Sequence, residues 1–197
     1  MYSKLPNLVL GFHGCDQKIF NHVLREHNQM EPSSNSYDWL GTGIYFWEQS
    51  YARALDWARN HRNIKSPAVI GAVIDLGHCL NLTDYQSTEV LKQGYNLLKA
   101  HCDLTGTEIP QNKNITGNSD LLLRRLDCAV VNQIHQYNRS NHKPEFDSVR
   151  GIFIEGNPIY PNSGFREKTH VQLCIVNPNC IKGFFNPIKP NDEYPIP

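Results

Sequence analysis

The sequence predicts a single α+β domain, with strands at both ends of the chain and helices mostly between them. A length of 197 residues fits one domain, which we take to span residues 1–197. The chain is 40% hydrophobic and 19% charged, a composition typical of globular proteins. Segments with strand patterning gather before residue 77 and after residue 148, and this grouping favours α+β over a strictly alternating fold.

Six runs of residues have the composition of strands, because they are rich in β-branched or alternating apolar residues. They are residues 7–12, 40–47, 67–76, 149–155, 170–176 and 181–185. The run at 67–76 is almost unbroken and predicts a strand buried on both faces, in which Asp75 caps a turn or meets a backbone amide. His13 and Gly14 follow the first strand as a turn-prone pair.

Four segments carry apolar residues at helical spacing. They are residues 16–28, 48–62, 87–102 and 120–137. Asp16 is the expected cap of the first helix, and Ser87 or Thr88 that of the third. Residues 31–38, 105–119 and 156–169 are predicted loops, and the tail from residue 186 holds four prolines, typical of a pinned or frayed extension.

Charge and cysteine content exclude several classes of function. Lys plus Arg equals Asp plus Glu at 19 each, so nothing supports a broad phosphate-binding surface. The six cysteines form no CxxC pair and the histidines no ligand motif, so we expect no metal site. We expect the cysteines to be buried free thiols, with disulfides as the alternative. They are Cys15, Cys79, Cys102, Cys128, Cys174 and Cys180.

The chain also lacks the sequence signals of a membrane protein. Its longest apolar stretch, residues 68–76, is far shorter than a membrane span. The N-terminal residues contain only a short apolar run and no cleavable signal. We therefore expect a cytoplasmic protein without a membrane segment, with secretion as an effector left open.

The first segment with chemical potential is Gly11-Phe12-His13-Gly14. A His at the end of a strand presents its ring at a sheet edge, and Gly14 allows the backbone to approach a planar ligand closely. The alternative is a surface turn with an incidental His.

The second segment, residues 39–47, is rich in glycine and aromatic residues. Strand alternation directs Tyr45 and Trp47 to one face and Phe46 to the other. No Lys-Ser/Thr pair follows the glycines, and a third glycine is missing, so neither a P-loop nor the dinucleotide fingerprint is present. The alternative is an aromatic strand of the core.

The third segment runs from a polar loop into the strand at 170–176. Alternation places His170, Gln172 and Cys174 on one side of this strand. Polar side chains on one face indicate a cleft, because burying an unpaired amide is costly. The alternative is a solvent-facing edge strand.

Together and in this order, the three segments resemble the ADP-ribosyltransferase superfamily. The similar branch is that of diphtheria toxin and the poly(ADP-ribose) polymerases, which is marked by a His, a Tyr and a Glu. The likeness spans residues 11–176, and Gly43-Ile44-Tyr45-Phe46 is its most specific match.

This resemblance implies a split β-sandwich that holds NAD, the substrate, in its central cleft. His13 would hydrogen-bond the adenosine-side ribose, and the Gly14 backbone would pair with the nicotinamide carboxamide. Tyr45 would stack on the nicotinamide ring, with Trp57 as the opposite wall. Gln172 stands where the family places its catalytic Glu, which binds the 2′-hydroxyl of the nicotinamide ribose.

Gln172 departs from the family pattern because it brings no charge. At an effective dielectric near 20, a charge about 4 Å away is worth roughly 4 kcal/mol before desolvation. Poly(ADP-ribose) chain extension is therefore not expected. Three outcomes stay open: transfer of one ADP-ribose, with Glu167 or the acceptor supplying the charge; hydrolysis of NAD; or binding of NAD or ADP-ribose without turnover. Cys15, where relatives carry Ser or Thr, is a milder departure.

The resemblance implies a protein or other macromolecule as acceptor, with nucleic acid expected only in that role. A toxin or effector with an antitoxin or immunity partner fits the habits of the family. An unrelated α+β interaction domain is the remaining alternative. Two interpretations stay open for each of four further residues. Arg166 either contacts the pyrophosphate or an acceptor, or it is a solvated loop charge. Glu155 and His170 either reach the cleft or have a structural role, and Glu167 either supplies the missing charge or does not.

Overall fold

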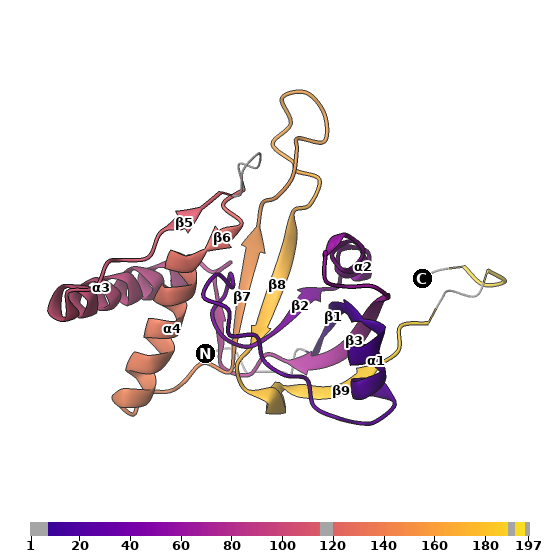
Figure 1. Ribbon diagram of the computed structural model, residues 1–197, viewed down its shortest axis with the longest axis horizontal. Helices are drawn as coiled ribbons and strands as arrows, with labels where there is room; N and C mark the ends of the chain where they lie inside the picture. The colour runs from indigo at the N-terminus through magenta and orange to yellow at the C-terminus, as the bar shows by residue number, and fades with distance from the viewer. Residues whose placement is uncertain (1–7, 115–119, 189–191, 196–197) are drawn as a thin grey trace.

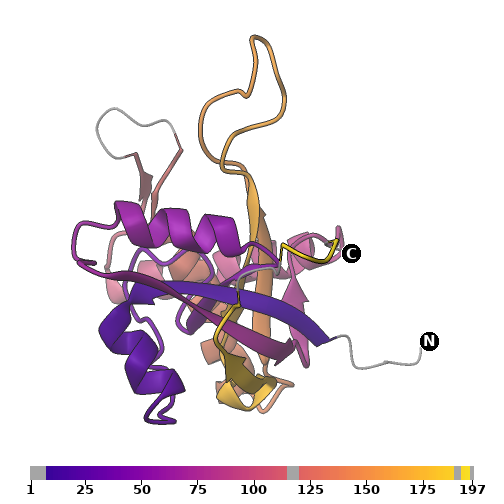
Figure 2. The same cartoon turned by 90° about the vertical axis from the view of Figure 1, so that its right-hand side faces the viewer.

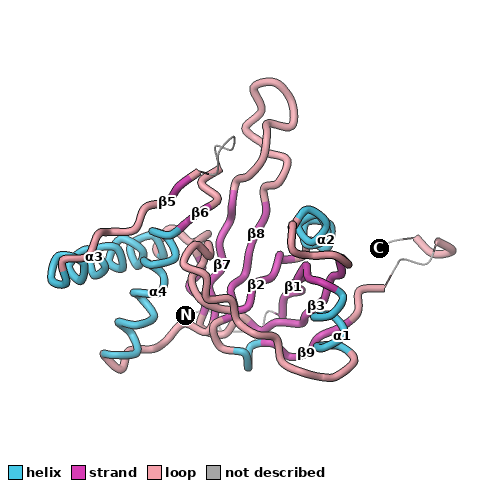
Figure 3. The backbone as a smooth tube through the Cα atoms, viewed as in Figure 1, coloured by secondary structure: helices cyan, strands magenta, loops and turns pink. Residues whose placement is uncertain are grey.

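A seven-stranded mixed sheet forms the centre of the computed structural model, with strand order β4-β7-β8-β2-β1-β3-β9 (Figure 1). The structure describes residues 8–114, 120–188 and 192–195. Within them four α-helices pack around this sheet, and β5 and β6 form a separate two-stranded ladder (Figure 3). The α+β class is therefore confirmed. The strands are β1 (Leu8–Asp16), β2 (Ile44–Glu48), β3 (Pro67–Asp75), β4 (Cys79–Asn81), β5 (Asn112–Lys113), β6 (Leu123–Arg124), β7 (Ser148–Phe153), β8 (His170–Ile175) and β9 (Ile181–Phe185), and the helices are α1 (Gln17–Leu24), α2 (Tyr51–Asn60), α3 (Ser87–Thr105) and α4 (Arg125–Ser140).

Each face of the large sheet is covered by helices. Phe12 of β1 pairs with Trp47 of β2, and Trp47 pairs with Gln172 of β8, so these three side chains share a face. Helices α2, α3 and α4 pack on that face, which we call the three-helix face. Helix α1 packs on the opposite face, the α1 face, where Phe46 and Leu173 belong to a second core cluster.

β1 is longer than the sequence predicts. It runs through the turn-prone pair His13-Gly14 because it pairs with β3 along its whole length, from Leu8–Asp75 to Asp16–Pro67. Asp16 caps α1 as expected and accepts a hydrogen bond from the Lys18 amide. The alternative of an edge strand for residues 170–176 is wrong, since β8 lies between β7 and β2.

The helix expected at 120–137 begins at Arg125 instead. Its first amides, those of Leu126 and Asp127, donate to the side-chain oxygen of Asn112 in β5, so a residue distant in sequence supplies the cap. The cap expected for α3 is also wrong, because the position before the helix is Gln86 and no side chain bonds there. The short strands β4, β5 and β6 were not predicted.

All six cysteines are free thiols, as expected, and all but Cys79 are buried. Burial raises the pKa of the Cys15 thiol to about 12 and that of Cys180 to about 11, so both stay protonated. Asp75 accepts a hydrogen bond from the Gly77 amide, which is the turn contact expected of it. Each helix in the described part of the chain is too short or too polar to cross a lipid bilayer.

Some expectations concern residues that the structure does not describe. Residues 1–7, in the N-terminal segment considered for a signal, lie outside the described ranges. So do residues 115–119 of the predicted loop and parts of the proline-containing tail.

Candidate functional site

The ladder between β1 and β2 breaks in the middle of the sheet. It contains the pairs Gly11–Glu48 and Phe12–Trp47 and then stops. The Gln49 amide donates to the Leu10 carbonyl at 2.9 Å, so Leu10, and with it every second residue of β1, directs its main-chain groups toward β2. In this register His13 would lie opposite Phe46, and the next hydrogen-bonded pair would be Gly14 with Tyr45; neither pair is part of the ladder. We call this place the β1–β2 split.

His13 bridges the β1–β2 split. Its Nδ1 lies 2.8 Å from the carbonyl oxygen of Tyr45. Because a carbonyl only accepts, Nδ1 carries the hydrogen, and Nε2 presents a lone pair. Burial lowers the pKa of His13, although the bond to Tyr45 opposes this shift. The imidazole is therefore neutral near pH 7, and its Nε2 acts as a hydrogen-bond acceptor.

Gly14 lies where helix α2 touches β1. A Cβ atom at this position would stand 2.2 Å from the carbonyl oxygen of Ala54 in α2, a distance that no side chain tolerates. The glycine is thus required by the close packing of a helix on a strand. The Gly14 N–H and C=O point into the β1–β2 split, by the same alternation that directs Leu10 toward β2.

Tyr45 occupies the three-helix face of β2 and packs against the core beneath α4. Its hydroxyl donates to the Gly41 carbonyl at 2.6 Å and accepts from the Leu40 amide at 2.9 Å. Burial raises the pKa of this hydroxyl. Gly41 has a φ of +82°, which favours glycine, and the Tyr45 hydroxyl fixes this turn in place.

Trp57 of α2 also lies on the three-helix face. Its ring is 5.6 Å from that of Trp47, at a tilt of 47°. Trp47 is 6% exposed, whereas Trp57 is half-buried, so Trp57 is the ring of this pair that retains an open surface.

Gln172 lies between Trp47 and Gly151 in register and is half-buried on the three-helix face. The structure thus brings Tyr45, Trp57 and Gln172 to one face of the sheet. His13 alternates with Phe12 and so belongs to the α1 face, where its ring is 6.0 Å from that of Phe46. It joins the others only through the Tyr45 main chain.

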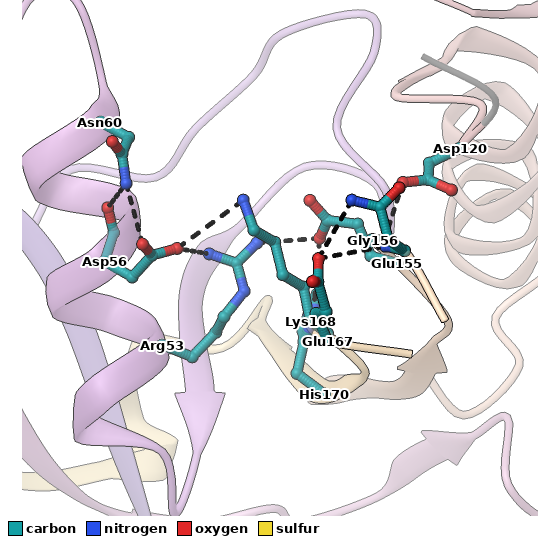
Figure 4. A network of polar contacts seen from close by, with 10 residues as sticks. Arg53, Asp56, Asn60, Asp120, Glu155, Gly156, Glu167, Lys168 and His170 are labelled. Atoms are coloured by element: carbon teal, nitrogen blue, oxygen red, sulfur yellow. Dashed lines mark hydrogen bonds and ion pairs between the residues drawn. The ribbon is translucent and has the colours of Figure 1, made fainter. Parts of the chain in front are cut away.

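An ionic network connects α2 with the base of the long hairpin between β7 and β8 (Figure 4). Arg53 of α2 binds Glu155 at 2.8 Å, and both side chains are nearly buried, at 13% and 12% exposure. Arg53 also binds Asp56 at 3.1 Å, and Lys168 lies 4.0 Å from the same carboxylate. The network holds α2, the helix that contains Trp57, against the hairpin that leads into β8, the strand that contains Gln172.

The hairpin itself, residues 154–169, extends well beyond the body of the protein (Figures 1 and 2). Glu167 is exposed and its carboxylate accepts from the backbone amide and side chain of Asn157 within the hairpin. Arg166 is exposed too, and its guanidinium donates to the Gly156 carbonyl at 3.5 Å. Of the two glutamates considered from the sequence, Glu155 rather than Glu167 lies beside β8: its carboxylate is 3.8 Å from His170.

His170 is buried beside the network. Its Nδ1 donates to the Lys168 carbonyl at 2.6 Å, and its ring stacks at 6.0 Å on Trp39. Burial lowers the pKa of His170, with Arg53 contributing, while the Lys168 carbonyl and Glu155 oppose the shift. Its Nε2 and the Trp47 indole N–H are both buried and have no hydrogen-bond partner in the described structure.

Sequence reasoning included Trp39 in a candidate segment without giving it a role, and it missed Arg53 and Arg124. Arg53 stands beside the apolar stripe of α2, which is the one local hint that it faces the sheet. Its partner Glu155 lies 102 positions away, and no local pattern predicts that pairing. Among the described residues, no three His, Cys, Asp or Glu side chains are grouped to hold a metal ion.

Comparison with known proteins gives little further guidance. No family model matches the chain. The chain is similar to a protein of Methanocaldococcus jannaschii named "Uncharacterized protein MJ0359", with 26% identity over 195 residues, covering 87% of this chain and 83% of the archaeal protein. The similarity extends over most of both chains rather than one segment.

Proposed function

We propose that this protein binds NAD at the β1–β2 split and transfers a single ADP-ribose to a macromolecular acceptor. In this proposal the parting of β1 from β2 is the central opening of a split β-sandwich of the ADP-ribosyltransferase type. The proposal combines the resemblance of three segments with one feature of the geometry: the β1–β2 ladder does not include the pair of Gly14 with Tyr45.

The geometry at Gly14 is the observation that carries the proposal. A main-chain N–H and C=O that lie past the end of the β1–β2 ladder match the C=O and NH₂ of a carboxamide, which accept and donate on one edge. Nicotinamide offers such an edge. The neutral His13 beside it presents an acceptor, and a ribose hydroxyl is a matching donor.

Aromatic surface supports the same ligand. Trp57 of α2 is half-buried, with its ring 5.6 Å from that of Trp47 and 4.6 Å from that of His61. A pyridinium ring stacked there would gain from the electron-rich indole face. The Tyr45 ring is the second proposed wall, although its hydroxyl is already committed to the turn at Gly41.

The proposed transfer breaks the bond between C1′ of the ribose and the nicotinamide nitrogen. Nicotinamide leaves with the bonding electron pair, and a nucleophile on the acceptor forms a new bond to C1′ and releases its proton to solvent. The oxocarbenium-like transition state gains from a nearby negative charge. Gln172 provides hydrogen bonds to the ribose but no such charge.

A second candidate function is binding of NAD or ADP-ribose without turnover. The state of the nearby carboxylates favours it: Glu155 is neutralised by Arg53, and Glu167 is bonded to Asn157 within the hairpin. NAD hydrolysis is the remaining enzymatic alternative, with water as the acceptor.

The test measures nicotinamide release from NAD by the full chain, with and without cell lysate, together with thermal stabilisation by NAD. Binding at a hundredfold excess over Kd stabilises by about 2.7 kcal/mol. His13→Ala is expected to weaken both signals, and His101→Ala, an exposed position on α3, is the matched control.

Gln172→Glu separates the two candidates. A large gain in nicotinamide release supports a transferase weakened by its missing charge, while NAD binding with no gain supports a binding module. If NAD neither stabilises the protein nor is cleaved, both are refuted and an unrelated α+β interaction domain is left.

A further inference from the structure

A cavity of about 680 Å³ lies on the three-helix face, apart from the β1–β2 split. Its floor is the Gly151–Phe153 end of β7, its sides are α3 and α4, and Trp39 and Leu40 close it toward β2. The absence of a side chain at Gly151 helps to keep this space open, since a Cβ there would stand 3.1 Å from Leu40.

Most of the cavity wall is apolar. It includes Leu82, Leu91, Leu126, Val130 and Phe153. Binding pockets for small molecules range from about 300 to 1,000 Å³ and combine such walls with a few fixed polar groups. A space of this volume and lining therefore suits the body of an organic ligand.

Arg124 supplies the fixed polar group. Its guanidinium lies 4.5 Å from the ring centre of Trp39 and 4.9 Å from that of Phe153, so two aromatic rings hold it in place. Its only hydrogen bond within the described residues runs from Nη1 to Asp127, at 3.3 Å. A guanidinium has five N–H donors, so most of its capacity is unused.

We propose that this cavity binds a small amphipathic carboxylate, with its apolar body against α3 and α4 and its carboxylate on Arg124. A planar guanidinium pairs with a carboxylate through two parallel hydrogen bonds, which gives the site a preference for that head group. Lys92, exposed at the edge of the cavity and bound to Glu89, adds a second positive group.

This site is separate from the proposed NAD site. None of the residues proposed for NAD binding lines the cavity, namely His13, Gly14, Tyr45, Trp57 and Gln172. The cavity proposal therefore does not rest on NAD binding, and each can fail without the other.

The test is calorimetric titration of the full chain with decanoate, decanol and decylamine, which share one apolar body and differ in head group. We expect saturable one-to-one binding of decanoate, weaker binding of decanol and still weaker binding of decylamine. Arg124→Gln should weaken decanoate roughly tenfold or more while leaving decanol nearly unchanged, because it removes a charged hydrogen bond.

Cavity-filling variants locate the ligand. Leu91→Trp and Leu126→Trp put an indole into the space from α3 and from α4, and either should abolish decanoate binding. Leu97→Trp, at a half-buried α3 position outside the cavity lining, is the control and should bind normally. Unfolding temperatures identify any variant that fails to fold. If one of the two filling variants fails to fold, the other one tests whether decanoate occupies the cavity.

Three results would overturn the proposal. They are the absence of saturable decanoate binding to the wild type, undiminished binding in a folded filling variant, and tighter binding of decylamine than of decanoate, which would make Asp127 the recognition group.

Discussion

His135 on α4 is buried, and neither of its ring nitrogens has a hydrogen-bond partner in the described structure. We predict that His135→Phe makes the stability of the fold less sensitive to acid. Burial lowers the pKa of His135, and Arg139 adds to the shift, while Glu145 opposes it. The ring centre of Phe146 lies 6.3 Å from that of the imidazole, at an angle of 85° between the ring planes, and an apolar ring provides no carbonyl or carboxylate acceptor for a proton. The folded protein therefore keeps this ring neutral.

The sign of the effect follows from the lowered pKa. The unfolded chain protonates His135 below a pH near its ordinary value of 6.5, whereas the folded protein does not. The stability that this group contributes is present above that pH and is lost as the pH falls toward the folded-state pKa. A full proton of difference between the two states amounts to about 1.4 kcal/mol per pH unit, which is the upper limit of the slope.

Urea denaturation of wild type and His135→Phe across pH 5 to about 7.5 measures this difference. Absolute stability depends on how well the new ring fits, since removing two unsatisfied atoms gains about 1–3 kcal/mol and overpacking costs a similar amount. The difference in pH dependence does not share this ambiguity. The wild-type curve should fall more steeply below pH 6.5, and parallel curves would refute the reasoning. His101→Phe, at an exposed site, controls for the loss of an imidazole.

Two further changes test the supports of the candidate site. Gly14→Ala should lower the free energy of unfolding by about 1–3 kcal/mol, because its Cβ would collide with the Ala54 carbonyl and displace α2. Urea titration measures this loss. Gly183→Ala is the control and should change the free energy of unfolding little, since a Cβ there meets nothing within 4 Å. Arg53→Met should lower the free energy of unfolding by about 3–5 kcal/mol, because it leaves the nearly buried Glu155 without its cation. Adding Glu155→Gln to this variant should recover part of the loss. Equal free energies of unfolding in the single and double variants would mean that the pair is not coupled.

Local sequence pattern predicted most of the secondary structure and the faces of two strands. The alternation of Tyr45 and Trp47 against Phe46 is confirmed, as is that of Gln172 and Cys174 against Leu173, because Phe46 and Leu173 belong to the core beneath α1. Successive side chains of a strand point to opposite faces whatever the strand pairs with, so the sequence alone contains this information.

From the sequence we predicted only that Gly14 allows the backbone to approach a planar ligand closely. The tertiary structure decided what fills the space, which is the backbone of α2 rather than a ligand alone. It likewise decided that the β1–β2 ladder stops before Tyr45, that His13 bonds to the Tyr45 carbonyl instead, and that Arg53 reaches Glu155. Partners and openings of this kind depend on segments far apart in the chain meeting in space, and the geometry of such meetings is set by the packing of the whole sheet and its helices, not by the residues next to each site.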